Sequence, residues 1–236
     1  MRVYWVILFF IFLAIGVFII LPAIAPTITA NEMIKTSYVT LGDTLVLLNQ
    51  SEIAAPFYDN ALQMNPDDPM ILKKKGEALL KSGQINEANL VYNRVLAQNG
   101  NDTVALARFG DVLMQQGDFK EALGYYDRAL KINPENAVVW LKQGDALLLM
   151  SVEENQKLHA IAKNLSNHPG STNYQPASND QLVNMESYKK AVASYQKAIE
   201  LDPRLSMIVS ARVLGATQNQ VNIYPSFFKD IQSSPG

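Results

Sequence analysis

The sequence contains no cysteine, and this absence excludes several kinds of chemistry. Without thiols the chain has no disulfide framework, no thiolate zinc site and no cysteine nucleophile. Histidine is nearly as scarce: the two histidines, His159 and His168, have no carboxylates at metal-binding spacing. The sequence also lacks a phosphate-binding glycine loop, a His-Glu-x-x-His motif and a serine elbow motif. We therefore predict that the protein is not an enzyme and holds no metal or cofactor.

An excess of basic residues is missing as well. Lys and Arg number 20 against 22 Asp and Glu, so the formal net charge of the 236 residues is -2. The densest basic run is Lys73-Lys74-Lys75, which is too short to make a basic stripe along a nucleic acid. The composition predicts that the chain does not bind nucleic acid.

Apolar residues are concentrated at the N-terminus. Within residues 3–25, only Gly16 and Pro22 lie outside the apolar set. A helix of this length is roughly 34 Å long, which is enough to cross the roughly 30 Å hydrocarbon core of a bilayer. We expect residues 1–30 to form an N-terminal transmembrane anchor. The remainder, at about 43% apolar, has the composition of a water-soluble body.

The orientation of this anchor rests on very few charges. Arg2 and the amino terminus precede the apolar segment, whereas the first cation after it is Lys35. Because cytoplasmic flanks carry the excess of Lys and Arg, the N-terminus is predicted to be cytoplasmic and the chain after residue 26 extracytoplasmic. A cleaved signal peptide is the alternative, with Ala23-Ile24-Ala25 as its small-x-small motif, and would give a secreted protein.

A period of 34 residues runs through the body of the chain. Gly42, Gly76, Gly110 and Gly144 are spaced by this interval, and a leucine follows each of them by three positions. Three other classes of residue recur in the same register. A bulky residue stands four positions before each glycine: Tyr38, Leu72, Leu106 and Trp140. After the first three glycines come an alanine and then a tyrosine: Ala54, Ala88 and Ala122; Tyr58, Tyr92 and Tyr126. Small residues on both helices of a unit, such as Gly110 and Ala122, are expected to let the two backbones approach closely.

This pattern resembles the tetratricopeptide repeat. The first copy matches the repeat most closely, at Tyr38, Leu41, Gly42, Leu45, Ala54, Tyr58, Ala61 and Pro66. The resemblance covers residues 35–150 and 187–203, although Lys75 and Gln143 stand where leucine is usual and Gly100 where proline is usual. It implies an all-α fold, a solenoid of helical hairpins with about four repeats and a C-terminal capping helix, preceded by one transmembrane helix.

The predicted array spans residues 31–218, with repeats at about 35–68, 69–102, 103–136 and 137–203. The fourth repeat is long, because Tyr195 and Pro203 stand 35 residues beyond their expected places, which puts an insertion at about 151–186. In one interpretation both helices of this repeat are longer than usual and span residues 137–166 and about 181–201. Asp180 would then be the N-cap of the second helix. A degenerate fifth repeat is the alternative. Residues 204–218 are predicted to form the capping helix, and residues 219–236 a C-terminal tail.

Charged residues recur in register with the glycines. An acid follows each glycine, and a cation stands three positions before each of the last three glycine-linked acids: Asp43, Glu77, Asp111 and Asp145; Lys74, Arg108 and Lys142. In tetratricopeptide arrays this part of the first helix lines the concave groove that holds peptides. The resemblance therefore implies that these seven residues bind a partner. The alternative is ion pairing within each helix at i, i+3, worth about 0.2–0.5 kcal/mol per pair.

Together these observations predict a membrane-anchored, extracytoplasmic scaffold that binds a peptide or protein partner through the groove of its repeats. The alternative is a non-catalytic accessory or assembly subunit of a membrane enzyme, a pilus or a secretion complex.

Overall fold

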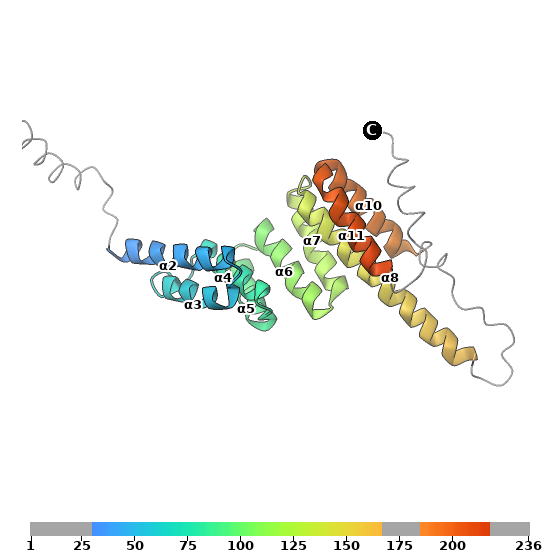
Figure 1. The fold of residues 1–236 in the computed structure, drawn as a ribbon, viewed down its shortest axis with the longest axis horizontal. Helices are drawn as coiled ribbons and strands as arrows, with labels where there is room; N and C mark the ends of the chain where they lie inside the picture. Colours follow the sequence, from blue (N-terminus) through green and yellow to red (C-terminus); the bar gives the residue numbers. More distant parts are fainter. Residues whose placement is uncertain (1–29, 167–184, 218–236) are drawn as a thin grey trace, which may run out of the picture. The chain divides into compact units, whose positions relative to one another are not determined.

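The computed structural model describes residues 30–166 and 185–217 (Figure 1). The predicted anchor segment 3–25, most of the predicted insertion loop and the tail 219–236 lie outside these ranges. No helix within the described ranges is long and apolar enough to cross a membrane. The chain divides into two compact units, with the boundary between Ser82 and Gly83.

The first unit contains one helical hairpin and the first helix of the next repeat: α2 (Ala30–Leu47), α3 (Ser51–Leu62) and α4 (Pro69–Lys81). Asn49, at a positive φ of 59°, reverses the chain between α2 and α3, a conformation that asparagine tolerates better than most residues. The side chain of Asp68 accepts hydrogen bonds from the amides of Met70 and Ile71, at 3.0 and 3.3 Å, and caps α4. Pro69 occupies the first helical position, where its missing N–H costs nothing.

The second unit continues the pattern of paired helices: α5 (Ile85–Gln98), α6 (Thr103–Gln116), α7 (Phe119–Ile132), α8 (Ala137–Ser166), α10 (Glu186–Leu201), the 3₁₀ turn η1 (Pro203–Leu205) and α11 (Ser206–Thr217). In sequence order, α6 packs on α7, α7 on α8 and α8 on α10, and α11 returns to pack on α8. Gly117 ends α6 in the left-handed region, at a φ of 87°, which a glycine adopts without strain.

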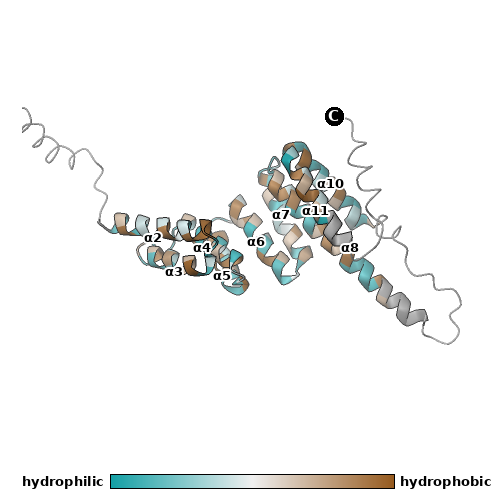
Figure 2. Cartoon of the chain, in the orientation of Figure 1, coloured by the Kyte–Doolittle hydropathy of each residue, from teal (hydrophilic) through white to brown (hydrophobic). Residues whose placement is uncertain are grey.

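Both apolar and polar residues lie along most of these helices (Figure 2). The apolar side chains meet between the helices. In the fourth repeat, Leu141 and Leu148 of α8 pack with Tyr188 and Tyr195 of α10 and with Val209 of α11. The all-helical class predicted from the sequence is confirmed, and the described ranges contain no strand.

The fourth repeat is a long hairpin. Its first helix, α8, runs without interruption for 30 residues, the length that the interpretation with two lengthened helices requires. Ser187 near the start of α10 donates a hydrogen bond to Glu154 Oε2 of α8 at 2.8 Å, so the extended part of α8 still contacts its partner helix. The start of α10 differs from the prediction of about residue 181: the helix begins at Glu186, after Met185, which makes no side-chain capping bond. The predicted cap, Asp180, lies outside the described residues.

Candidate functional site

Three of the repeated glycines make room for a tyrosine ring. A Cβ added to them would lie 2.5–2.7 Å from the nearest ring carbon, closer than real Cβ contacts come: Gly42 against Tyr58, Gly110 against Tyr126, and Gly144 against Tyr195. The prediction that Gly110 serves close approach to Ala122 is therefore incomplete. The space at the glycine is filled by an aromatic ring from the second helix, and the three tyrosines are at most 1% exposed.

The acid next to each of these glycines accepts a hydrogen bond from the hydroxyl of the same tyrosine. The oxygen–oxygen distances are 2.8, 2.9 and 2.9 Å, for Tyr58 to Asp43, Tyr126 to Asp111, and Tyr195 to Asp145. Burial is the main cause that raises the pKa of each tyrosine, since it disfavours the charged phenolate. A neighbouring carboxylate adds to the rise at Tyr58 and Tyr126. In these three repeats the glycine, acid and tyrosine form one cluster, which we call the Gly–acid–Tyr cluster.

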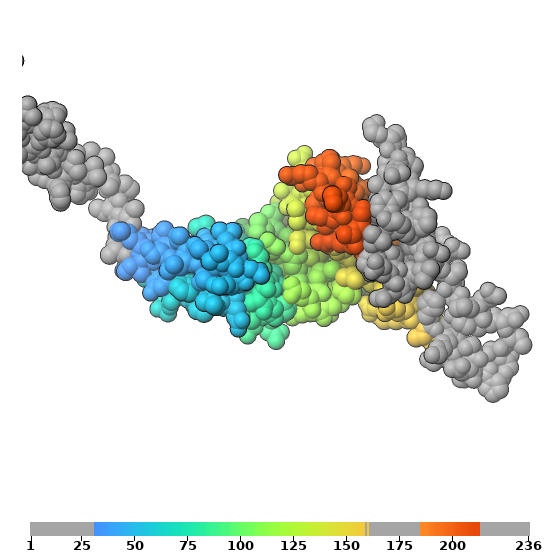
Figure 3. Space-filling view, in the orientation of Figure 1, coloured from blue at the N-terminus to red at the C-terminus, as the bar shows by residue number. Residues whose placement is uncertain are grey.

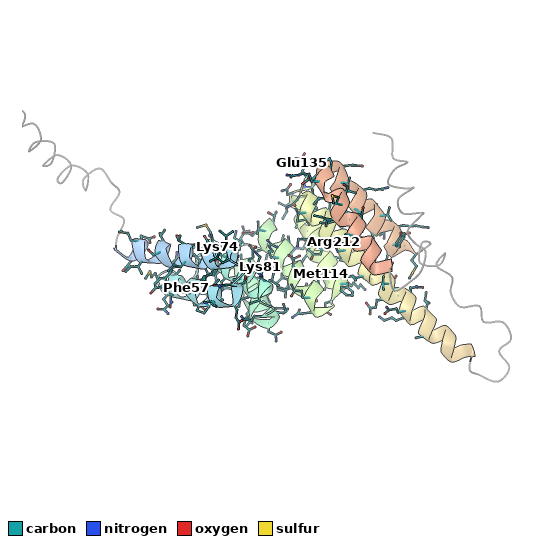
Figure 4. All side chains as sticks on the ribbon, in the orientation of Figure 1. Phe57, Lys74, Lys81, Met114, Glu135 and Arg212 are labelled. Atoms are coloured by element: carbon teal, nitrogen blue, oxygen red, sulfur yellow. The ribbon has the colours of Figure 1, made fainter. Side chains whose placement is uncertain are left out.

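Within each unit, a lysine from the next repeat reaches the acid of this cluster. In the first unit Lys74 Nζ of α4 lies 2.5 Å from Asp43 Oδ2 of α2 (Figure 4). In the second unit Lys142 Nζ of α8 lies 2.6 and 2.7 Å from the two carboxylate oxygens of Asp111 in α6. Both pairs are 31 residues apart in sequence. These lysines therefore join consecutive repeats.

Pairing within a helix, the alternative raised by the sequence, also occurs. Arg108 Nη1 lies 3.3 Å from Asp111 Oδ2, three residues later in α6. In the first unit, Lys81 Nζ lies 3.1 Å from Glu77 Oε1, four residues earlier in α4. All seven predicted residues thus lie in ion pairs within the chain. Five of them pair with one another, whereas Glu77 and Asp145 pair with Lys81 and Arg212, two residues that the sequence analysis missed.

The second of these missed residues is Arg212 of the capping helix α11, labelled in Figure 4. It forms an ion pair with Asp145. Burial lowers the pKa of this guanidinium, against the opposing influence of the charge on Asp111. The sequence contained a signal for this pair. The other pairs are 31 residues apart, and the fourth repeat carries a 35-residue insertion. Counting both from Asp145 leads to position 211, one residue before Arg212. The helix α11 therefore supplies the cation that a further repeat would supply.

In the second unit the cations are more exposed than the acids they cover. The side chains of Asp111 and Asp145 are 14% and 16% exposed. The side chains of the cations are more exposed, at 22% for Lys142, 35% for Arg108 and 44% for Arg212. The carboxylates lie between the buried tyrosine hydroxyls and the more exposed cationic groups. This surface of α6, α8 and α11, defined by Arg108, Lys142 and Arg212, is called the cationic face below.

A second surface in the same unit is a hollow of about 790 Å³ bordered by α7, α8 and α10. Its apolar lining comes from Leu123, Trp140, Leu147 and Met150. Trp140, which the repeat pattern places in the core, is only half-buried, and its indole Nε1 donates to the carbonyl of Pro134 at 2.8 Å. The volume falls within the range of roughly 300–1,000 Å³ that small-ligand pockets occupy.

Among the residues that the structure describes, no three His, Cys, Asp or Glu side chains are grouped so as to hold a metal ion. The side chain of His159 and the whole of His168 lie outside those residues.

Parts of the chain match family models of a known helical repeat. Family models described as tetratricopeptide repeat match residues 49–108, 104–136 and 182–205. A search of curated protein sequences finds no match.

Solved structures of MamA are similar to this chain. The structure titled MamA 41-end from Desulfovibrio magneticus RS-1 is 18% identical, with a TM-score of 0.58 over 84% of this chain and 93% of that one. A MamA RS-1 double mutant, also 18% identical, has a TM-score of 0.56 over 84% and 92% of the two chains. A further MamA crystal structure, 16% identical, has a TM-score of 0.52 over 81% and 92%. At these identities the likeness concerns the fold.

Proposed function

We propose that this chain, which matches tetratricopeptide-repeat family models over residues 49–136 and 182–205, is a non-catalytic scaffold that binds a peptide or protein partner on its repeats. The proposal includes attachment to a membrane through residues 3–25, with the repeats outside the cytoplasm. The apolar composition of that segment and the position of Arg2 before it support this placement.

The observation that carries the binding role is the cationic face of the second unit. Its carboxylates are engaged by tyrosine hydroxyls and by Lys142, Arg108 and Arg212, which leaves the cationic groups as the more exposed partners. A partner segment that carries Asp or Glu side chains fits this surface, because charge-assisted hydrogen bonds to partly desolvated cations are the strong ones.

The test is partner capture by chemical cross-linking in intact cells, followed by mass spectrometry. The variant changes Arg108, Lys142 and Arg212 to Gln, which removes three charges and keeps hydrogen-bonding side chains. The matched control changes three cations of the same unit outside the face, Lys120→Gln, Lys131→Gln and Lys157→Gln. We expect the first variant to lose the partner and the control to retain it, with equal helicity by circular dichroism. Equal capture by both variants would show that the cationic face is not the binding surface.

The same experiment addresses the accessory-subunit alternative. Cross-links to many proteins support a general scaffold, whereas stoichiometric co-purification with one membrane enzyme or envelope complex supports a dedicated subunit. Membrane topology is tested separately by protease digestion of intact cells. Repeats that resist digestion until the membrane is opened would contradict the extracytoplasmic placement.

A further inference from the structure

The first described helix, α2, and the turn residue Leu48 directly after it carry a row of large apolar side chains that remain exposed. Ile34, Leu41 and Leu48 follow one another at intervals of seven residues and are 45%, 49% and 63% exposed. Ser37 and Thr44 stand between them, so successive members alternate at three and four residues, the spacing that keeps side chains on one side of a helix. We call these five residues the α2 stripe. Residues of α2 form part of the surface in Figure 3.

The two hydroxyl residues in the α2 stripe do not prevent its burial. Ser37 Oγ donates to the carbonyl of Met33, and Thr44 Oγ1 donates to the carbonyl of Thr40, both at 2.8 Å. Because these donors are already satisfied within the helix, covering them leaves no unpaired hydroxyl proton.

The charged residues of α2 lie off the stripe. Lys35 and Glu32 pair with each other at 2.6 Å, and Asp43 is directed to Tyr58 and Lys74. The stripe itself has no charged member, so two copies of it would meet without repulsion between like charges.

The equivalent positions in later repeats show what packs against this side of a first helix. At the position equivalent to Leu41 in α4, Lys75 contacts Asp59 of the preceding helix α3 at 2.5 Å. At the same position in α8, Gln143 contacts Asp127 of the preceding helix α7 at 2.6 Å. In the second and fourth repeats this position of the first helix therefore contacts the preceding helix. Before α2 the described ranges contain no preceding repeat, and Leu41 is half exposed.

We propose that the α2 stripe pairs with the α2 stripe of a second copy of this chain, which makes the protein a dimer. A seven-residue alternation of large and small side chains is self-complementary, since the large residues of one helix enter the spaces above the small residues of the other. An uncharged stripe also does not select a partner of opposite charge. The stripe spans two heptads, so the pairing is weak and reversible. It is independent of the cationic face.

The absence of native cysteine makes a direct test available. Leu41 is the central residue of the stripe, so a cysteine there meets its counterpart whether the two helices run parallel or antiparallel. The full chain carrying Leu41→Cys, in detergent micelles under mild oxidation, should form a disulfide-linked dimer. The matched control is Thr40→Cys, an exposed neighbour on another side of the helix. We expect dimer formation at least tenfold faster for Leu41→Cys. Equal rates for the two variants, or no covalent dimer in either, would overturn the proposal.

A charge on the stripe supplies an independent readout. Analytical ultracentrifugation of the otherwise unaltered full chain should show a dimer that Leu41→Glu weakens at least tenfold, while Thr40→Glu leaves it unchanged. Circular dichroism should show the same helicity in both, because both positions are exposed. Undiminished dimer in Leu41→Glu, or a cysteine cross-link from position 41 to a different protein in place of a second copy, would also show that the proposal is wrong.

Discussion

The third and fourth repeats build the same Gly–acid–Tyr cluster at very different sequence separations. Tyr126 follows Asp111 by 15 residues and Tyr195 follows Asp145 by 50, yet both hydrogen bonds measure 2.9 Å. The close approach of ring to glycine is also the same, at 2.5 and 2.6 Å from the added Cβ. The 35 additional residues stand in sequence between the two positions that form the fourth-repeat cluster. The facing of the two helices, and not the length of their connection, therefore determines this contact.

The two repeats differ in how their acids are neutralised. Asp111 receives Lys142 from the next repeat and Arg108 from its own helix, whereas Asp145 receives Arg212 from the capping helix. A helix outside the regular register can therefore replace the cation of a missing repeat. The capping helix thus extends the pattern of the array as well as covering apolar residues of α8 and α10.

Alkaline pH is expected to have the largest effect on both clusters. The pKa of each buried tyrosine is raised above its ordinary value of 10.0, so above that pH the folded chain binds more protons than the unfolded chain. The free energy of unfolding is therefore maintained below pH 10 and falls as the pH rises above it, by up to about 1.4 kcal/mol per pH unit for each tyrosine. Urea unfolding at a series of pH values measures this slope.

Phenylalanine variants turn the alkaline experiment into a comparison of the two repeats. Tyr126→Phe and Tyr195→Phe should each reduce the slope by the same amount, because both rings are almost completely buried. A smaller reduction for Tyr195→Phe would mean that the long hairpin holds its tyrosine less firmly.

Alanine at the glycines is expected to have the next largest effect. In Gly110→Ala and Gly144→Ala the new methyl group overlaps the ring of Tyr126 or Tyr195, and overpacking of this kind costs about 1–3 kcal/mol. Gly124→Ala in α7 is the matched control, since a Cβ there has no neighbour within 4 Å and alanine favours the helix by about 1 kcal/mol. Thermal unfolding should order the variants accordingly. A stabilised Gly144→Ala beside a destabilised Gly110→Ala would show that the two clusters are not equivalent.

Removal of the neutralising cations should have the smallest effect. Lys142→Gln and Arg212→Gln are each expected to cost less than about 1 kcal/mol, because both cations are partly exposed and the pairs are screened by salt. The difference from the unaltered chain should shrink as the ionic strength rises. A much larger loss for Arg212→Gln, independent of salt, would mean that α11 holds the fourth repeat together mainly by this contact.

The fold was more accessible to sequence reasoning than the contacts of the candidate site. The 34-residue register correctly predicted helical hairpins, since the spacing of Gly, Ala and Tyr reports one face of each helix directly. The start of α10 was harder to predict from the sequence, because Met185 has no capping side chain that would mark the first turn of the helix. The partners of the charged residues were also uncertain, because Lys142 stands three residues from Asp145 in sequence and yet contacts Asp111, which is 31 residues away.

The period of the array and the chemical type at each repeated position follow from the residues alone, because a helical repeat places the same residue in the same local environment every 34 residues. Three contacts depend on the packing of the helices: the glycine accommodates a tyrosine ring, the acid accepts a hydrogen bond from its hydroxyl, and Arg212 pairs with the acid of the last cluster. Those contacts join residues on different helices. Their geometry depends on how the helices face one another, and that facing is established when the apolar sides of the hairpins pack together.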